Sequence, residues 1–188
     1  MTYQETGHAD VGDAARPAER SATETPGNSG LKVFRAGRQE EILAVRDLAL
    51  EYHAESRYAH IPFSERKFIR FFSKAISSPT DTLSLYVQHN GRTVGLLNAG
   101  VGEYYLGEGG RMVTVYALYV SKAARASALG GRVTVKLIRI LNDWANTQKA
   151  EEVHIHVTSG VDPERTDNLL RRLGYRPYGG NYAKGQGR

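Results

Sequence analysis

Apolar and polar positions divide the chain into a polar beginning and a long region with regular periodicities. Residues 1–30 are rich in small, polar and acidic side chains and hold almost no large apolar ones. Such a segment cannot bury enough apolar surface to offset the entropy lost on ordering, so we predict a disordered acidic tail. From Leu31 onward apolar positions recur at regular spacing, which predicts a single folded domain over residues 31–188.

Within this domain the apolar positions change between strand-like alternation and helix-like spacing. Asn90-Gly91 separates two strand-like runs and predicts a hairpin, because both residues tolerate positive φ. Ser64 and Asp162-Pro163 are typical of helix starts, and Gly174 is typical of a helix end. The predicted strands cover residues 31–35, 82–89, 92–105, 111–120, 153–157 and 175–184 (the last as a strand or bent hairpin), and the predicted helices cover 42–52, 64–78, a stretch from the turn at 125–131 to about 148, and 163–173.

The resulting order, β-α-α-β-β-β-α-β-α-β, mixes hairpins with helical connections. It predicts an α/β (α+β) fold in which helices flank a mixed, mostly antiparallel sheet. No sequence period of 20–50 residues repeats, which excludes a solenoid or propeller. Such a sheet exposes edge strands, and a homodimer would cover one.

The charge balance narrows the range of partners. The chain carries a net charge of +5, and residues 1–30 hold five acidic and two basic side chains, so the remainder carries +8. A basic body suits nucleic acid, a phosphate-rich cofactor or simply a solvated surface. Nucleic acid is not favoured, because no run of Lys and Arg with interleaved aromatic residues occurs.

Other features of the sequence indicate in which cellular compartment the protein is expected. No apolar stretch approaches the ~20 residues of a membrane span, and no secretory signal is visible. The chain has no cysteine, which removes disulfides, thiolate metal sites and a cysteine nucleophile. We therefore expect a cytoplasmic protein.

Small residues gather in the turn after the fourth predicted strand, Arg125-Ala126-Ser127-Ala128-Leu129-Gly130-Gly131. Backbone N–H groups at the start of a helix bind phosphate, and small side chains let the phosphate approach the main chain. Arg125 and Arg132 add positive charge, and Ser127 adds a hydroxyl. The alternative is a tight turn that binds nothing, since neither G-x-G-x-x-G nor the Walker pattern is present.

The spacing around this turn resembles that of a known family. Leu118-Tyr119-Val120 is followed by four residues and then by Arg125-Ala126-Ser127-Ala128-Leu129-Gly130. This is similar to the central motif of the GNAT N-acetyltransferase superfamily, Q/R-x-x-G-x-G/A, which begins five residues after the last hydrophobic position of its strand. Leu173-Gly174-Tyr175 and the element order from about residue 31 to 184 also resemble the family. The ending Gly180-Asn181-Tyr182-x-Lys184 looks like that of a small branch common in phages and proteobacteria.

The resemblance implies a GNAT-like fold with acetyl-CoA as co-substrate and no metal. The main-chain N–H of Leu118 would hold the oxyanion, Val120 would contact the pantetheine arm, and the amides from Ser127 to Arg132 would hold the pyrophosphate. The cofactor-binding residues that it implies are Leu118, Val120, Arg125, Ser127, Ala128, Leu129, Gly130, Gly131 and Arg132.

The chain also departs from the family's pattern. Ala128 replaces the first glycine of the motif, Leu170 replaces the tyrosine that protonates the leaving thiolate, and Pro163 replaces an asparagine. Thr114 aligns with the family's frequent glutamate base. The resemblance therefore implies cofactor binding by this chain, but it does not identify a catalytic acid or base.

Other residues are candidates for catalysis. The resemblance puts His156 on the strand that diverges from the fourth one, beside the thioester. A free imidazole titrates at ~6.5, which suits a general base. His154 shares its strand face, and Tyr116 could position a water. Tyr182, with Tyr178 second, could protonate the thiolate; ordinary packing or exposure is the alternative for each of these residues.

We expect the acceptor amine between the connection of the first two helices and the hairpin of the third and fourth strands. Carboxylates there would attract an ammonium group, and aromatic rings could stack on it. Exposed loop composition is the alternative. The candidate acceptor-binding residues are Glu55, Tyr58, His60, Glu103 and Tyr105.

Together these features predict an acetyl-CoA-dependent N-acetyltransferase that transfers the acetyl group directly to a primary amine of a small molecule or protein. Two alternatives stay open. The basic body suits toxin-like acetylation of an aminoacyl-tRNA. The missing glutamate and tyrosine suit a non-catalytic acyl-CoA-binding sensor or scaffold.

Overall fold

The structure is a computed structural model that describes residues 30–180 and 182–184. Apart from Gly30, the predicted tail over residues 1–30 lies outside the described residues. Among the helices described, none is both long and apolar enough to cross a membrane.

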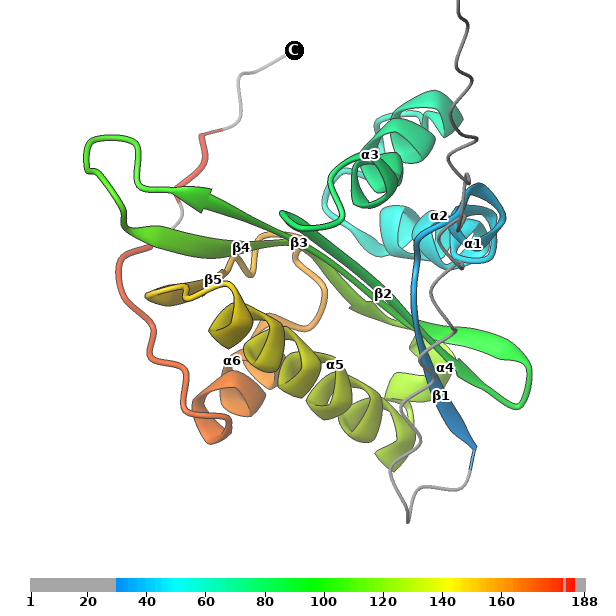
Figure 1. The fold of residues 1–188 in the computed structure, drawn as a ribbon. Coiled ribbons are helices and arrows are strands. Elements are labelled where there is room, and N and C mark those ends of the chain that lie inside the picture. Colours follow the sequence, from blue (N-terminus) through cyan, green and yellow to red (C-terminus); the bar gives the residue numbers. More distant parts are fainter. Residues whose placement is uncertain (1–29, 181, 185–188) are drawn as a thin grey trace, which may run out of the picture.

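Five strands form one sheet in chain order, β1-β2-β3-β4-β5 (Figure 1). The first four pair antiparallel, and β5 pairs with β4 in parallel. The β2–β3 hairpin turns at Asn90 and Gly91, with φ of 50° and 75°, as the Asn-Gly pair predicted. The strands are β1 (Leu31–Arg35), β2 (Thr82–His89), β3 (Arg92–Glu103), β4 (Arg111–Val120) and β5 (Glu152–Ile155).

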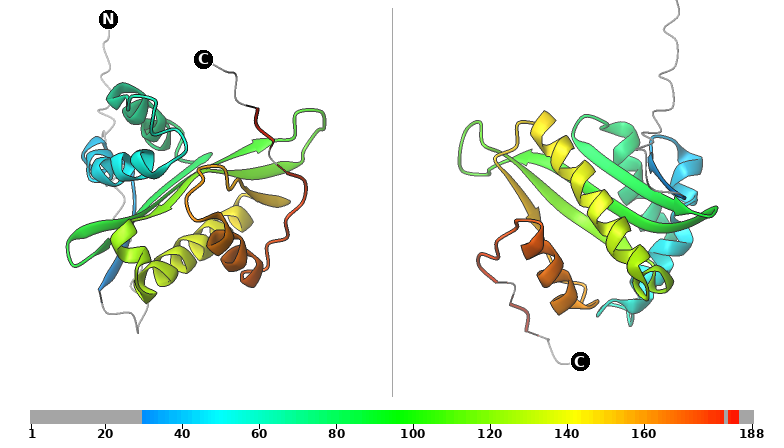
Figure 2. Two further views of the ribbon diagram at one scale, coloured as in Figure 1. Left: turned by 180° about the vertical axis from the view of Figure 1, so that it is seen from behind. Right: turned by 90° about the horizontal axis from the view of Figure 1, so that it is seen from below.

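Helices cover both faces of this sheet (Figures 1 and 2). α1 (Gln39–Leu43), α2 (Arg46–Glu55) and α3 (Glu65–Ser77) lie on one face. α5 (Ala128–Thr147) and α6 (Pro163–Arg172) lie on the other, and the one-turn α4 (Lys122–Arg125) leads from β4 into α5. The predicted three-layer α/β architecture is confirmed.

Each face of the sheet has its own apolar core. On the α5 side, Val133 and Leu137 pack against the strands and are fully buried. On the α1–α3 side, Phe68, Phe72 and Tyr119 pack together. Burying one such apolar side chain contributes about 1.5–3 kcal/mol, so the sheet is fixed from both sides.

Two predicted elements differ from the structure. The predicted helix over 42–52 is divided into α1 and α2 by a turn at Ala44 and Val45, where the buried Val45 has φ −102° and ψ 0°. The predicted final strand over 175–184 is wrong, since residues 175–180 and 182–184 are irregular. Pro177 cannot donate to a strand ladder and Gly179 adopts φ of 68°, which both oppose a strand.

The turn after β4 is also shorter than predicted. Arg125 ends α4, and Ser127 is the N-cap of α5. Gly130 and Gly131 therefore lie within the first turn of α5 rather than in a loop before it. Asp162 precedes α6 as predicted, but its side chain forms no capping hydrogen bond.

Candidate functional site

The parallel strands β4 and β5 run together for only part of their length. Their register extends from Met112 opposite Glu152 to Val115 opposite Ile155. β5 ends there, whereas β4 continues to Val120. A cavity of about 560 Å³ opens where the strands separate, and residues 114–120 of β4 line it.

One extra residue in β4 determines which side chains face the cavity. Asn98 of β3 pairs with Ala117 but Ala99 pairs with Val115, so Tyr116 forms a β-bulge. The alternation shifts at this point, because Val115 belongs to the core under α5 whereas Ala117 belongs to the core under α1–α3. Leu118 and Val120 consequently return to the α5 side.

Elements far apart in the chain complete the cavity wall. Tyr52 of α2 and Phe71 of α3 line it on one face of the sheet, and Gly130 and Gly131 of α5 line it on the other. The loop over residues 156–162 covers the middle, and the main-chain N–H of Arg57 ties it to the end of α2 by donating to the Ser159 carbonyl at 2.8 Å. The cavity thus passes from one helix layer to the other through the opening in the sheet.

The first turn of α5 is suited to an anion. The Ser127 hydroxyl accepts from the Leu129 N–H at 3.3 Å and donates to the Ala124 carbonyl at 3.2 Å, which fixes the start of the helix. The Ser127 N–H also donates to the Ala124 carbonyl at 3.2 Å, and the Gly130 N–H donates to the Ser127 carbonyl at 3.3 Å. The attraction for an anion here comes from the helix dipole, which adds partial positive charge at this end. Gly131 brings this turn to the cavity wall.

The two glycines of this turn have different roles. A Cβ atom on Gly130 would lie 2.7 Å from Cα of Arg125 and 2.9 Å from the Ala124 carbonyl oxygen. Gly130 therefore allows α4 and α5 to pack closely, a packing role that the motif alone did not indicate. A Cβ on Gly131 would meet no described atom within 4 Å. Gly131 is therefore the position that leaves space for a ligand above the helix end.

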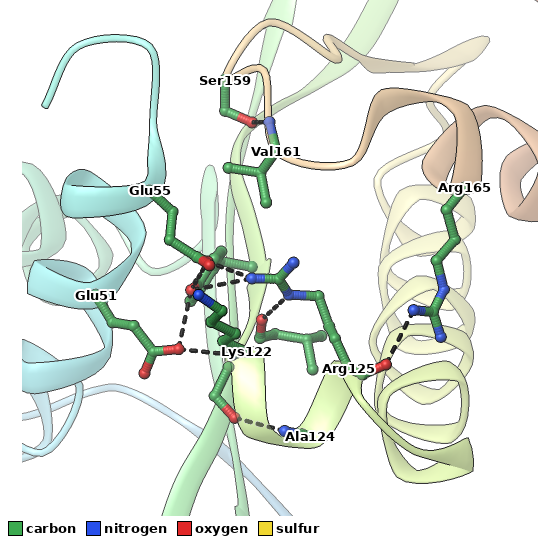
Figure 3. Close-up of polar contacts among 11 residues, drawn as sticks. Glu51, Glu55, Lys122, Ala124, Arg125, Ser159, Val161 and Arg165 are labelled. Atoms are coloured by element: carbon green, nitrogen blue, oxygen red, sulfur yellow. Dashed lines mark hydrogen bonds and ion pairs between the residues drawn. The ribbon is translucent and has the colours of Figure 1, made fainter.

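Arg125, which we expected to face phosphate, is bound by protein groups (Figure 3). Its Nε donates to the Val120 carbonyl at 2.9 Å, and its Nη2 donates to the Glu55 carboxylate. The guanidinium also lies 5.4 Å from the centroid of the Tyr119 ring. Burial and a hydrogen bond to Glu55 raise the pKa of Tyr119, so its hydroxyl stays protonated and donates to both Glu51 and Glu55.

Two of the predicted catalytic residues line the cavity. His156 does so directly after β5 ends. Tyr116, at the bulge, packs its ring against Phe71 with centroids 6.1 Å apart and is 55% exposed. Its ring also covers Gly100, because a Cβ atom on Gly100 would lie 2.9 Å from the Tyr116 ring.

The predicted thiolate acids do not line this cavity. Tyr182 is 97% exposed. The Tyr178 hydroxyl donates to Glu152 at 3.2 Å and lies 2.9 Å from Nε2 of His154, which is itself 2.8 Å from the Glu152 carboxylate. Hydrogen bonds from His154 and then Tyr178 lower the pKa of Glu152. His154 is thus engaged beside β5 in this cluster, which distinguishes it from His156.

The structure brings none of the predicted acceptor residues to the cavity wall. Glu55 is bound to Arg125 and Tyr119. Tyr58 is 46% exposed beside the Arg57 guanidinium. The other three are exposed: His60 lies between α2 and α3, Glu103 ends β3, and Tyr105 lies in the turn that follows.

Sequence reasoning missed most residues of the wall, and Tyr52 and Arg165 are two examples. Tyr52 belongs to the apolar stripe of α2, and that periodicity marked it as packing rather than as part of a site. Burial raises the pKa of Tyr52, and a hydrogen bond with Ser159 acts in the opposite direction. Arg165 of α6 lines the cavity and donates to the Arg125 carbonyl at 2.9 Å, and no spacing in the sequence indicated it.

The site fits a long ligand with an anionic end. A helix start lies at one end of the cavity, and the rest of its wall combines aromatic and aliphatic side chains with polar ones. In the part of the chain that the structure describes, no group of three or more His, Cys, Asp and Glu side chains is arranged to hold a metal ion.

No protein-family model matches the sequence, and no curated protein matches it. Solved structures do match its fold. An aminoglycoside acetyltransferase from an uncultured soil metagenomic sample is 18% identical, with a TM-score of 0.59 over 84% of this chain and 99% of that one. Glucosamine-6-phosphate N-acetyltransferase from Arabidopsis thaliana is 15% identical, with a TM-score of 0.59 over 82% and 97%.

A third match carries a ligand related to the expected co-substrate. AAC(6')-Iy, in complex with the bisubstrate analogue CoA-S-monomethyl-acetylneamine, is 12% identical, with a TM-score of 0.58 over 84% of this chain and 99% of that one. These matches confirm the fold that the motif at Arg125 implied. The chain has the fold of the GNAT acetyltransferases.

Proposed function

We propose that this protein is an acetyl-CoA-dependent N-acetyltransferase that transfers an acetyl group to a primary amine. One observation carries the proposal. A single cavity joins the first turn of α5, which suits phosphate, to an aromatic region around Tyr52 and Phe71 on the other face of the sheet. Cofactor and acceptor could then meet at the opening between β4 and β5.

The cofactor end of the site consists of main-chain groups. Amides from about Ser127 to Arg132 would hold the pyrophosphate, and Gly131 leaves space above them. The end of β4, with Leu118 and Val120 in the cavity wall, would lie along the pantetheine arm. Bound acetyl-CoA would supply a thioester carbonyl for attack by the amine.

The protein's own groups would then handle charge and protons. As the amine nitrogen bonds to the carbonyl carbon, the main-chain N–H of Leu118 would stabilise the oxyanion, and His156 would accept the proton of the amine. The carbon–sulfur bond then breaks. The departing thiolate would take its proton from solvent, because Tyr182 does not line the cavity.

Similar structures support an amine acceptor of modest size. Two of the matched structures are an aminoglycoside acetyltransferase and a glucosamine-6-phosphate N-acetyltransferase, and both substrates carry amines. In this chain Phe71, Tyr116 and Tyr52 supply aromatic walls at the expected acceptor end. Aromatic faces attract organic ammonium groups.

The test is turnover with a defined set of acceptors. Purified protein would be incubated with acetyl-CoA and with aminoglycosides, amino sugars, polyamines, peptides or aminoacyl-tRNA, and released coenzyme A would be measured together with the mass of the product. We expect an increase of the acceptor mass by one acetyl group. Binding of acetyl-CoA without acetylation of any acceptor would instead support a non-catalytic sensor, and exclusive acetylation of aminoacyl-tRNA would support the toxin-like activity.

A further inference from the structure

Two carboxylates of α2 face the corner between β4 and α4. Glu51 and Glu55 are four residues apart, so they lie on the same face of the helix. Figure 3 shows both side chains directed at this corner. The Tyr119 hydroxyl lies between them and donates to both carboxylates, at 3.0 Å to Glu51.

Glu51 holds the beginning of α4. Its carboxylate accepts a hydrogen bond of 2.6 Å from the main-chain N–H of Lys122, the first residue of that helix. This N–H has no acceptor within its own helix, and a negative charge at a helix start is favourable. A residue 71 positions earlier in the chain therefore caps α4, together with the neighbouring Ser121 hydroxyl.

Glu55 holds the end of α4. It pairs with Arg125, the last residue of the helix, and both side chains are only 22% exposed. The same guanidinium donates to the Val120 carbonyl, so Arg125 links α2 to the end of β4. A charge-assisted pair that is largely shielded from water is stronger than an exposed one.

α4 in turn fixes the first turn of α5. Gly130 lies so close to Arg125 and the Ala124 carbonyl that a Cβ would not fit, so the two helices pack in direct backbone contact. Arg165 of α6 donates to the Arg125 carbonyl from the other side at 2.9 Å. A displacement of α4 would therefore displace the amides of the first turn of α5.

We propose that Glu51 and Glu55 are positioning residues that hold α4, and through it the first turn of α5, in the geometry that binds the phosphates of coenzyme A. This inference rests on the proposed function for its ligand. It replaces the expectation that Glu55 attracts the acceptor amine, because its carboxylate is committed to Arg125 and Tyr119. The two glutamates set the affinity for the cofactor and leave the chemical step unchanged.

The experiment compares Glu51→Gln and Glu55→Gln with the matched control Glu65→Gln. Glu65 also pairs with an arginine, since Nε of Arg46 donates to it at 2.7 Å, but this pair belongs to α2 and α3 outside the cavity wall. Calorimetry with coenzyme A gives Kd, steady-state kinetics gives KM and kcat, and hydrogen exchange reports on residues 122–131.

We expect each variant of the corner to raise Kd and KM for the cofactor about tenfold, which corresponds to about 1.4 kcal/mol, with kcat within about twofold of the wild type. Hydrogen exchange over residues 122–131 should become faster in both variants without any ligand. The Glu65 control should leave Kd and exchange in this segment unchanged. If Glu55→Gln does not fold, the Glu51→Gln variant alone tests the inference, since it retains the ion pair between Glu55 and Arg125.

Three results would overturn the inference. Unchanged Kd in both folded variants would show that the corner does not position the site. An equal change in the Glu65 control would show only a general loss of stability. A fall in kcat at constant KM would mean that the glutamates act in the chemistry. The proposed function has its own test: it is wrong if the wild-type protein does not bind coenzyme A. In that case, hydrogen exchange over residues 122–131 that is slow in the wild type and faster in the variants would still support the positioning of α4.

Discussion

His156 is the titratable side chain that comes directly after the end of β5, where the parallel strands separate. Its neighbour His154 is 6.5 Å away between ring centroids, but is bound to Glu152 and Tyr178. The two rings belong to one strand face, yet only His156 lines the cavity. This difference allows one histidine to serve as the control for the other.

Replacing His156 with Ala should therefore lower kcat for amine acetylation by about 100-fold, because general-base catalysis typically contributes that much. Replacing His154 with Ala should change kcat by less than about twofold, since its ring lies outside the cavity wall. Steady-state kinetics at saturating acetyl-CoA makes the comparison. Equal rates for wild type and the His156 variant would exclude this residue as the base.

At the scale of single elements, the first turn of α5 has one glycine that packing requires and one that it does not. Ala at Gly131 meets open space and removes a glycine from a helix, which is worth about 1 kcal/mol of stability. The added methyl group would occupy the space that we assign to phosphate. We expect Gly131→Ala to raise the melting temperature while weakening coenzyme A binding about tenfold.

We expect Gly130→Ala to have the opposite effect on stability. Its melting temperature should fall, because the new Cβ would collide with the backbone of α4. Thermal unfolding followed by circular dichroism, with calorimetry for coenzyme A, separates the two effects. A folded Gly131→Ala protein that binds coenzyme A as tightly as the wild type would contradict the assignment of phosphate to this turn.

At the scale of the whole molecule, the segment after α6 folds back to the outer edge of the sheet through Tyr178. Its hydroxyl contacts Glu152 and His154 of β5. These hydrogen bonds hold the pKa of Glu152 below its ordinary value of 4.5. Stability from this contact is therefore present above that value and is lost as the pH falls through the lower pKa of the folded state.

Tyr178→Phe removes one of these hydrogen bonds. We expect the variant to unfold in less urea than the wild type near neutral pH, and the difference to shrink in acid, as the pH falls through the lowered pKa of Glu152 and its carboxylate becomes protonated. Urea titrations near neutral pH and in acid measure this. A difference of the same size in both conditions would mean that the hydroxyl acts through another partner.

Local patterns predicted most of the fold because they are read from neighbouring residues. The Asn90-Gly91 hairpin was correct, and the Ser64 hydroxyl caps α3 by accepting from the Lys67 N–H at 3.4 Å. The predicted final strand was wrong, because Pro177 and Gly179 prevent one.

The site was predicted only where it depends on residues that are close together in the sequence. The spacing from Val120 to Arg125 located the turn to which we assign phosphate, and five of the nine implied cofactor residues line the cavity: Leu118, Val120, Arg125, Gly130 and Gly131. The sequence did not indicate Tyr52 of α2 or Arg165 of α6. It also did not indicate that Arg125 pairs with Glu55, which lies 70 positions earlier in the chain. Such contacts depend on packing between layers, which no short spacing encodes.

The bulge at Tyr116 sets which side chains at the end of β4 face each helix layer. If Tyr116 took a regular place in the alternation, Ala117 and Tyr119 would turn toward α5, and Leu118 and Val120 would turn toward α2 and α3. Tyr119 would then lose both glutamates, and the end of the strand would bury the wrong side chains on each face. Deletion of Tyr116 would instead close the bulge and leave these orientations unchanged, so descendants of this chain can shorten β4 by one residue here more readily than they can straighten it at its present length.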